Sequence, residues 1–204
     1  MENPVKVWAL HGGLVVAMLG CKTPEETTEE RRREWLDYRP ASEVLVYCVD
    51  SRGVANDLLE AAVSHASRVN ARLLGFVVIE DARVRCIPQE GVSDKQAALE
   101  ELGKNRGDVP RGEEDALSSA FRLALNMASV SPSASRRILY IGNGRLDEGM
   151  SFNGILSKTA SRNWTRVPID CLVDDPAVMK GQNVSLVFRT AKMSGGILFL
   201  DLDG

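Results

Sequence analysis

An unbroken apolar run, VLVYCV, occupies residues 44–49. Polar residues bound the run on both sides, with Glu43 before it and Asp50 after it. A strand that is apolar at every position must be covered on both faces, which is typical of the central strands of a parallel sheet. The run therefore predicts an α/β protein.

The rest of the chain alternates between helical and strand-like patterns. Apolar residues at three- to four-residue spacing predict helices at 56–70, 94–102, 115–127, 151–162 and 184–193. Apolar runs predict further strands at 73–79, 83–87, 137–142, 167–173 and 196–202, the first two joined as a hairpin. Residues 103–112, rich in Gly, Pro and charge, predict a loop. The alternation predicts a doubly wound, mostly parallel six-stranded sheet with one antiparallel edge strand and helices on both faces.

Composition narrows the class of protein. A chain of 204 residues with 44% hydrophobic and 26% charged residues suits one globular domain with a tail. The formal net charge of -3 gives no general attraction to phosphate backbones, so nucleic acid is not an expected partner. The four cysteines lack CxxC spacing and there are only two histidines, so neither a zinc site nor a thiol redox pair is expected.

The N-terminal run VWALHGGLVVAML, at residues 7–19, has the length of a signal-peptide core. It is followed by Cys21, and the sequence Met18-Leu19-Gly20-Cys21 resembles a loose bacterial lipobox. This favours a lipoprotein-type signal peptide at 1–20, lipidation of Cys21, a charged linker at 21–42 and a domain at 43–204. The protein is then expected to be exported and membrane-anchored. In the alternative, the run is a buried strand or helix of the fold, Cys21 is a core thiol and the protein is cytoplasmic.

The ordered set of segments resembles the von Willebrand factor A (vWA) family. VLVYCVDSRG resembles that family's first strand and its DxSxS metal motif, LLGFVVIEDARV its second and third strands, and GEEDALSSAFRLAL the loop and helix that carry its metal-binding Thr. RRILYIGNGRLDEG, VPIDCLVDDP and SGGILFL resemble its later strands. The resemblance runs from about Glu43 to Asp201 and implies a vWA-like or Rossmann-like fold.

In the vWA family, the metal site takes one Asp and two Ser from DxSxS, a Thr from a second loop and an Asp from a third, around a cation such as Mg²⁺. In this chain Arg52 and Val54 stand at the two Ser positions. The oxygens that the resemblance leaves as metal candidates belong to Asp50, Ser51, Asp115 and Asn143, with Glu113 or Glu114 as alternatives to Asp115. The favoured interpretation is that no cation binds, that Asp50 pairs with Arg52 or caps the next helix, and that Asp115 is an N-cap. No cofactor is therefore expected, with Mg²⁺ as the alternative.

The expected function is a non-enzymatic protein-binding module. Loops on a rigid sheet are the usual contact surface, and those at the carboxyl edge contain Arg52, Gly53, Arg111, Gly112, Asn143, Gly144 and Arg145. The arginines fit an acidic partner, or are ordinary solvated charges. A phosphatase using the closing DLDG motif is less favoured, because the chain ends without the supporting catalytic groups. A dinucleotide carrier would need a GxGxxG after its first strand, which is missing.

Overall fold

The computed structural model describes residues 6–10, 14–18, 37–52, 57–80, 83–102, 104, 108–109, 115–130, 134–142, 152–163, 166–173 and 182–199. Its strands are β1 (Lys6–Leu10), β2 (Leu14–Met18), β3 (Val44–Asp50), β4 (Leu73–Glu80), β5 (Arg83–Ile87), β6 (Ser93–Asp94), β7 (Asp108–Val109), β8 (Arg136–Ile141), β9 (Ile169–Leu172) and β10 (Leu198–Phe199). Its helices are α2 (Asp57–Arg68), α3 (Lys95–Leu102), α4 (Ala116–Ala128), α5 (Phe152–Arg162) and α6 (Gln182–Ser194).

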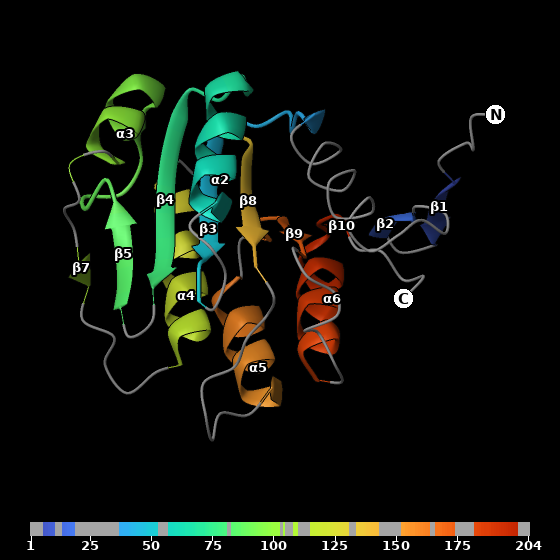
Figure 1. The fold of residues 1–204 in the computed structure, drawn as a ribbon. Coiled ribbons are helices and arrows are strands. Elements are labelled where there is room, and N and C mark those ends of the chain that lie inside the picture. Colours follow the sequence, from blue (N-terminus) through green and yellow to red (C-terminus); the bar gives the residue numbers. More distant parts are fainter. Residues whose placement is uncertain are drawn as a thin grey trace.

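The described strands form one sheet in the order β1-β2-β10-β9-β8-β3-β4-β5-β7, with β6 beside β4 (Figure 1). Its centre, β10-β9-β8-β3-β4-β5, consists of the six strands that the sequence predicts. Neighbours among these six are parallel, except that β5 is antiparallel to β4. The predicted mostly parallel sheet with one antiparallel edge strand is confirmed.

The structure also contains short strands that the sequence patterns did not predict. β7 pairs antiparallel with β5, which corrects the expectation that residues 103–112 are entirely loop. β6 pairs antiparallel with β4 just before α3 begins. Each has two residues, so neither is long enough to show the alternating pattern that reveals a strand in a sequence.

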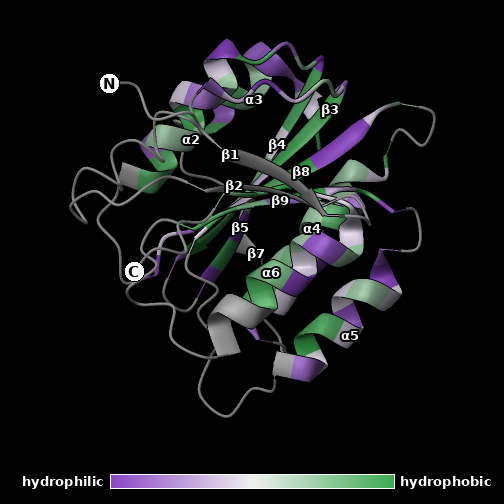
Figure 2. Cartoon of the chain, turned by 90° about the vertical axis from the view of Figure 1, so that its right-hand side faces the viewer, coloured by the Kyte–Doolittle hydropathy of each residue, from purple (hydrophilic) through white to green (hydrophobic). Residues whose placement is uncertain are grey.

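The sheet is covered on both faces, as its apolar strands require. Side chains along β3 alternate between two cores: Val44, Val46 and Cys48 pack with α4, α5 and α6, and Leu45, Tyr47 and Val49 with α2 and α3. Figure 2 shows these two groups of helices on opposite sides of the sheet. Every residue of β3 is buried, so this strand is the centre of the molecule.

The helices begin and end within two residues of their predicted bounds. The N-terminal end of α4 shows why the start of a helix can be predicted from the sequence. The carboxylate of Asp115 accepts hydrogen bonds from the backbone N–H groups of Leu117, at 2.8 Å, and Ser118, at 3.1 Å. It therefore satisfies two of the N–H groups that a helix leaves unpaired at its N-terminus.

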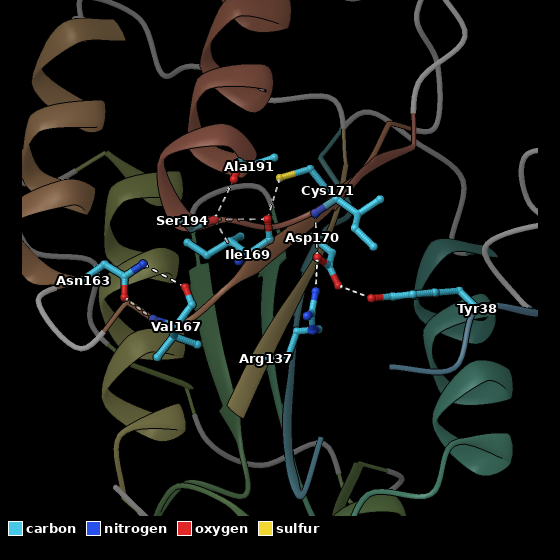
Figure 3. Close-up of polar contacts among 10 residues, drawn as sticks. Tyr38, Arg137, Asn163, Val167, Ile169, Asp170, Cys171, Ala191 and Ser194 are labelled. Atoms are coloured by element: carbon cyan, nitrogen blue, oxygen red, sulfur yellow. Dashed lines mark hydrogen bonds and ion pairs between the residues drawn. The ribbon is translucent and has the colours of Figure 1, made fainter. Parts of the chain in front are cut away.

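The described end of the predicted linker, residues 37–42, packs against the domain. Figure 3 shows the Tyr38 hydroxyl pointing at Asp170 on β9, to which it donates a 2.9 Å hydrogen bond. The Tyr38 carbonyl oxygen lies 2.6 Å from Nε2 of His65 on α2. The centroid of the Tyr38 ring lies 5.1 Å from that of the Phe199 ring. The packed unit therefore starts before residue 43.

The N-terminal apolar run, with Lys6 before it, forms β1 and β2, which pair as an antiparallel hairpin. β2 extends the sheet by pairing parallel with β10, with Val16 opposite Leu198. This arrangement corresponds to the alternative in which the run belongs to the fold. Cleavage and lipidation remain predictions, and Cys21 lies outside the described residues. None of the described helices combines the length and the apolarity that spanning a bilayer requires.

Candidate functional site

The candidate site lies where β3 and β8 end side by side. β3 leads toward α2 on one face of the sheet, whereas β8 leads toward α5 on the other. Neighbouring parallel strands whose connections diverge in this way open a crevice at their carboxyl ends, which is where open α/β sheets bind ligands. Asp50 is the last residue of β3, and α4 starts next to Asp115 at the same edge.

Asp50 and Arg52 form a two-bond ion pair at this edge of the sheet. Nε of Arg52 donates to Oδ1 of Asp50 and Nη2 to Oδ2, each at 2.8 Å. The backbone N–H of Arg52 also points at Oδ1, at 3.3 Å. The two side chains are only 4% and 2% exposed. Both carboxylate oxygens are therefore occupied by a cation that belongs to the chain itself.

Further polar groups surround the Arg52 guanidinium. Burial alone would lower the pKa of Arg52, but the hydrogen bonds and charge of Asp50, with contributions from Tyr140 and Asp115, raise it above its ordinary value. Arg52 is therefore permanently charged, and Asp115, itself 2% exposed, contributes to its field. The Tyr140 hydroxyl on β8 completes the cluster at 3.5 Å from Oδ2 of Asp50.

The backbone of Gly142, just after β8, lies directly beside the Asp50 side chain. A Cβ at this position would lie 2.6 Å from the Cβ of Asp50 and 2.8 Å from the Tyr140 hydroxyl oxygen. The Gly142 N–H donates to the carbonyl of Leu172 at 3.1 Å, which holds this backbone in place. The glycine therefore lets the end of β8 approach the ion pair closely.

The structure brings together three of the residues singled out from the sequence, Asp50, Arg52 and Asp115. Ser51 is half-buried next to them, and its N–H donates to the carbonyl of Ile79 at 3.0 Å. In the part of the chain that is described, no three His, Cys, Asp or Glu residues are grouped as a metal site. Seven of the other predicted site residues lie outside the described ranges: Cys21, Gly53, Arg111, Gly112, Asn143, Gly144 and Arg145.

Tyr140 and Gly142 belong to the site but were not predicted as site residues. The sequence carries a weak signal for both, because a tyrosine interrupts the aliphatic run RILYIG and a glycine ends it. The residues around Tyr140 in the sequence do not determine the direction in which its side chain points. Only the parallel pairing of β8 with β3 puts its hydroxyl next to Asp50.

Comparison with known proteins bears on the fold. No family model and no curated protein matches the chain. Among solved structures, the conserved hypothetical protein BatB from Bacteroides thetaiotaomicron aligns with a TM-score of 0.50 and 16% identity, over 78% of this chain and 90% of that one. An aerotolerance-related membrane protein from Bacteroides fragilis NCTC 9343 aligns with a TM-score of 0.49 and 17% identity, over 79% and 92%. A von Willebrand factor type A protein from Catenulispora acidiphila aligns with a TM-score of 0.42 and 12% identity, over 75% and 42%.

At this identity the match with BatB shows a shared fold and no more. With the strand order and the two layers of helices described above, the chain has a vWA-like α/β fold. Its carboxyl edge carries a buried Asp50–Arg52 ion pair.

Proposed function

We propose that this chain is a non-enzymatic protein-interaction module of vWA type that works without a metal ion. The observation that carries the proposal is the buried, two-bond pairing of Asp50 with Arg52. In the family that the sequence resembles, the first Asp of DxSxS helps to bind a dication. Here the guanidinium provides the opposite charge instead.

Electrostatics oppose a metal ion at this place. A dication approaching Asp50 has to displace the guanidinium from both oxygens, and the displaced Arg52 is still held nearby by its own backbone. Two like charges a few ångströms apart in a buried site repel by several kcal/mol at an effective dielectric constant of about 20. The resemblance also assigns two metal-binding hydroxyls to positions 52 and 54, where this chain has Arg and Val.

A partner protein would contact the carboxyl-edge loops, because a rigid sheet presents loops there on a fixed base. The ion pair supports this role by tying the start of the loop after β3 to the end of the strand. Arg111 and Arg145, which the sequence pattern assigns to the predicted loops of this edge, favour an acidic partner surface.

The metal question is tested by isothermal titration of the whole protein with Mg²⁺ and Mn²⁺, beside an Arg52→Ser variant. Arg52→Ser removes the internal cation and restores a hydroxyl at the position where the vWA motif has one. We expect no binding heat from the wild type and weak, metal-specific heat from the variant. Submillimolar binding by the wild type that disappears in Asp50→Asn would instead establish a rearranged divalent-cation site.

The interaction surface is tested by capturing partners on the immobilised protein and repeating the capture with an Arg111→Glu, Arg145→Glu variant. An acidic partner should be lost from this variant. Arg72→Glu is the matched control, since this exposed residue precedes β4 at the opposite edge of the sheet. Equal capture by all three proteins would refute the carboxyl-edge surface.

A lipid tether at Cys21 is a separate part of the proposal. It is supported by the signal-like run at residues 7–19 and by the position of Cys21 after it. In a cleaved lipoprotein β1 and β2 are removed, so tether and hairpin exclude one another in the same molecule. The intact mass of the protein purified from bacterial membranes decides: a chain starting at a diacylated Cys21 supports the tether, and a chain that keeps residues 6–18 refutes it.

A further inference from the structure

Basic side chains gather on the outside of the helical layer that α4, α5 and α6 form. α5 packs against both α4 and α6. Figure 2 shows α5 and α6 on the side of the molecule away from α2 and α3. The basic side chains of α5, of α6 and of the segment before β9 are exposed or partly exposed, and we call them the basic face: Lys158, Arg162, Arg166, Arg189 and Lys192.

The charge of this region is one-sided. Among the described residues, α5, residues 166–169 and residues 182–199 contain no acidic side chain. The whole chain nevertheless has a formal net charge of -3. Positive charge is therefore concentrated on the basic face while the rest of the chain is acidic, and such a separation gives the face a positive potential of its own.

Helix capping accounts for only part of this charge. Arg162 and Lys192 lie in the last turns of α5 and α6, where a cation offsets the partial negative charge of the helix end. Lys158, Arg166 and Arg189 lie outside those last turns. More than half of the basic face therefore has no role in stabilising a helix end.

The same helical layer carries exposed apolar side chains. Within the described residues, the large apolar side chains that are exposed belong to Val130 and Met193, at 62% and 58%. Met193 is next to Lys192 in the last turn of α6, and Val130 follows the end of α4. Cations beside exposed apolar side chains are the combination that peripheral proteins use at the headgroup boundary of a membrane.

The chain enters the domain close to one end of the basic face. Asp170 on β9 accepts a hydrogen bond from Tyr38, at 2.9 Å (Figure 3). The neighbouring Ile169 N–H donates to Ser194 at the end of α6, also at 2.9 Å (Figure 3). The entry point and the end of α6 are therefore held by adjacent residues of one strand, and a tether on the N-terminal side of Tyr38 would bring this end of the domain to a bilayer.

We propose that the basic face docks the domain on an anionic membrane surface. Its lysines and arginines pair with the phosphate groups of acidic phospholipids, and Met193 inserts between the headgroups. Because the chain as a whole is negatively charged, it is held at such a surface only when the basic face is turned toward it. The inference rests on the proposed lipid tether for bringing the chain to a membrane, but the docking itself needs no lipid on the chain.

The first test is co-sedimentation of the whole Cys21→Ser chain, which cannot be lipidated, with lipid vesicles. One set is phosphatidylcholine alone, and the other contains phosphatidylcholine and phosphatidylglycerol in equal parts. We expect binding to the anionic vesicles that weakens as salt is raised, and little binding to the neutral ones. No binding to the anionic vesicles at low salt, or equal binding to both sets, overturns the proposal and leaves the tether at Cys21 untouched.

Paired charge variants locate the binding. A lysine or arginine near an anionic surface contributes about fivefold to the partition coefficient, so Arg166→Gln combined with Lys192→Gln should weaken vesicle binding by roughly 25-fold. The matched control combines Arg83→Gln with Lys104→Gln, two exposed residues on β5 and just after α3 that remove the same charge. The control should bind like the parent chain. An equal loss in both double variants would show a general charge effect and overturn the basic face.

The apolar contact and the kind of partner are tested separately. Met193→Ser should weaken vesicle binding by roughly three- to tenfold, because it removes the exposed apolar side chain without changing charge. Unchanged binding in Met193→Ser would contradict its insertion between the headgroups. Polyglutamate serves as an acidic polypeptide. If it binds the chain while anionic vesicles do not, the basic face fits a protein rather than a membrane and the proposal fails.

Discussion

Arg52 lies two residues after Asp50 and neutralises its carboxylate from within the chain. Removing one partner of a buried pair leaves the other charged and desolvated, which typically costs about 3–5 kcal/mol. We expect Arg52→Ser to lower the free energy of unfolding by roughly 3 kcal/mol in metal-free buffer, measured by urea denaturation. The double variant Asp50→Asn, Arg52→Ser should recover most of this loss because no buried charge remains. A single variant as stable as the wild type would contradict the structural role of the pair.

His65 is the second residue whose charge state matters. It is fully buried: Nε2 donates to the Tyr38 carbonyl, and Nδ1 lies 2.7 Å from the Tyr47 hydroxyl and accepts from it. Burial lowers the pKa of His65 from 6.5 to about 4, against the opposing effect of the Tyr38 hydrogen bond. Protonation of the imidazole would put a hydrogen on Nδ1, which could then no longer accept the hydrogen bond from Tyr47.

The lowered pKa makes stability depend on pH. Below about pH 6.5, His65 becomes protonated in the unfolded chain, whereas in the folded protein it stays neutral until about pH 4. The free energy of unfolding therefore falls as the pH drops through this window. We expect His65 to contribute a loss of about 2 kcal/mol between pH 7 and pH 5, measured by urea unfolding. A His65→Gln variant should lack this part of the pH dependence. If the free energy of unfolding depends on pH equally in the wild type and in His65→Gln, the contribution of His65 is refuted.

At the scale of single elements, α4 depends on its cap. Asp115 accepts from two backbone N–H groups of the first turn, which an asparagine side chain can also do. Asp115→Ala should therefore cost about 1 kcal/mol of unfolding free energy and Asp115→Asn much less. Chemical denaturation of the three proteins checks the order. If Asp115→Asn is as damaging as Asp115→Ala, the carboxylate acts mainly through its charge toward Arg52 rather than as a cap.

At the scale of the whole molecule, Asp170 joins parts of the chain that are far apart in sequence. Its carboxylate accepts from the Tyr38 hydroxyl at 2.9 Å, from Arg137 at 2.6 Å and from the Ile197 N–H at 2.8 Å (Figure 3). Burial raises the pKa of Asp170 despite the opposing charge of Arg137 and these hydrogen bonds. Asp170 on β9 thereby holds together three other parts of the chain: residue 38 before β3, residue 137 on β8 and residue 197 just before β10.

This network predicts that residues 37–42 unfold together with the sheet. Tyr38→Phe removes one bond to a buried carboxylate and should lower the free energy of unfolding by about 1–2 kcal/mol in a single cooperative transition. Combining it with Asp170→Asn should give less than the sum of the two losses, because the hydroxyl and the carboxylate are partners. Additive losses would show that the hydroxyl and the carboxylate are not coupled. No loss in Tyr38→Phe, which keeps the ring, would show that Tyr38 acts through its ring contact with Phe199 alone.

The six central strands, the helices α2 to α6 and their vWA-like order could be predicted from the sequence, because apolar periodicity and helix caps are local signals. It also left three roles open for Asp50, as metal ligand, as partner of Arg52 or as cap of the next helix, and two for Asp115, as metal ligand or as N-cap. Asp50 and Asp115 turned out to be engaged within the chain, Asp50 with Arg52 and Asp115 as the cap of α4.

Which side chains contact one another depends on how the strands and helices pack in three dimensions. Tyr140 reaches Asp50 because β8 lies parallel beside β3, and Tyr38 reaches Asp170 across 132 positions of sequence. The strands β6 and β7 exist through pairing with β4 and β5, and the basic face exists because α5 and α6 pack side by side. These contacts depend on strand order and register, which a one-dimensional pattern does not contain.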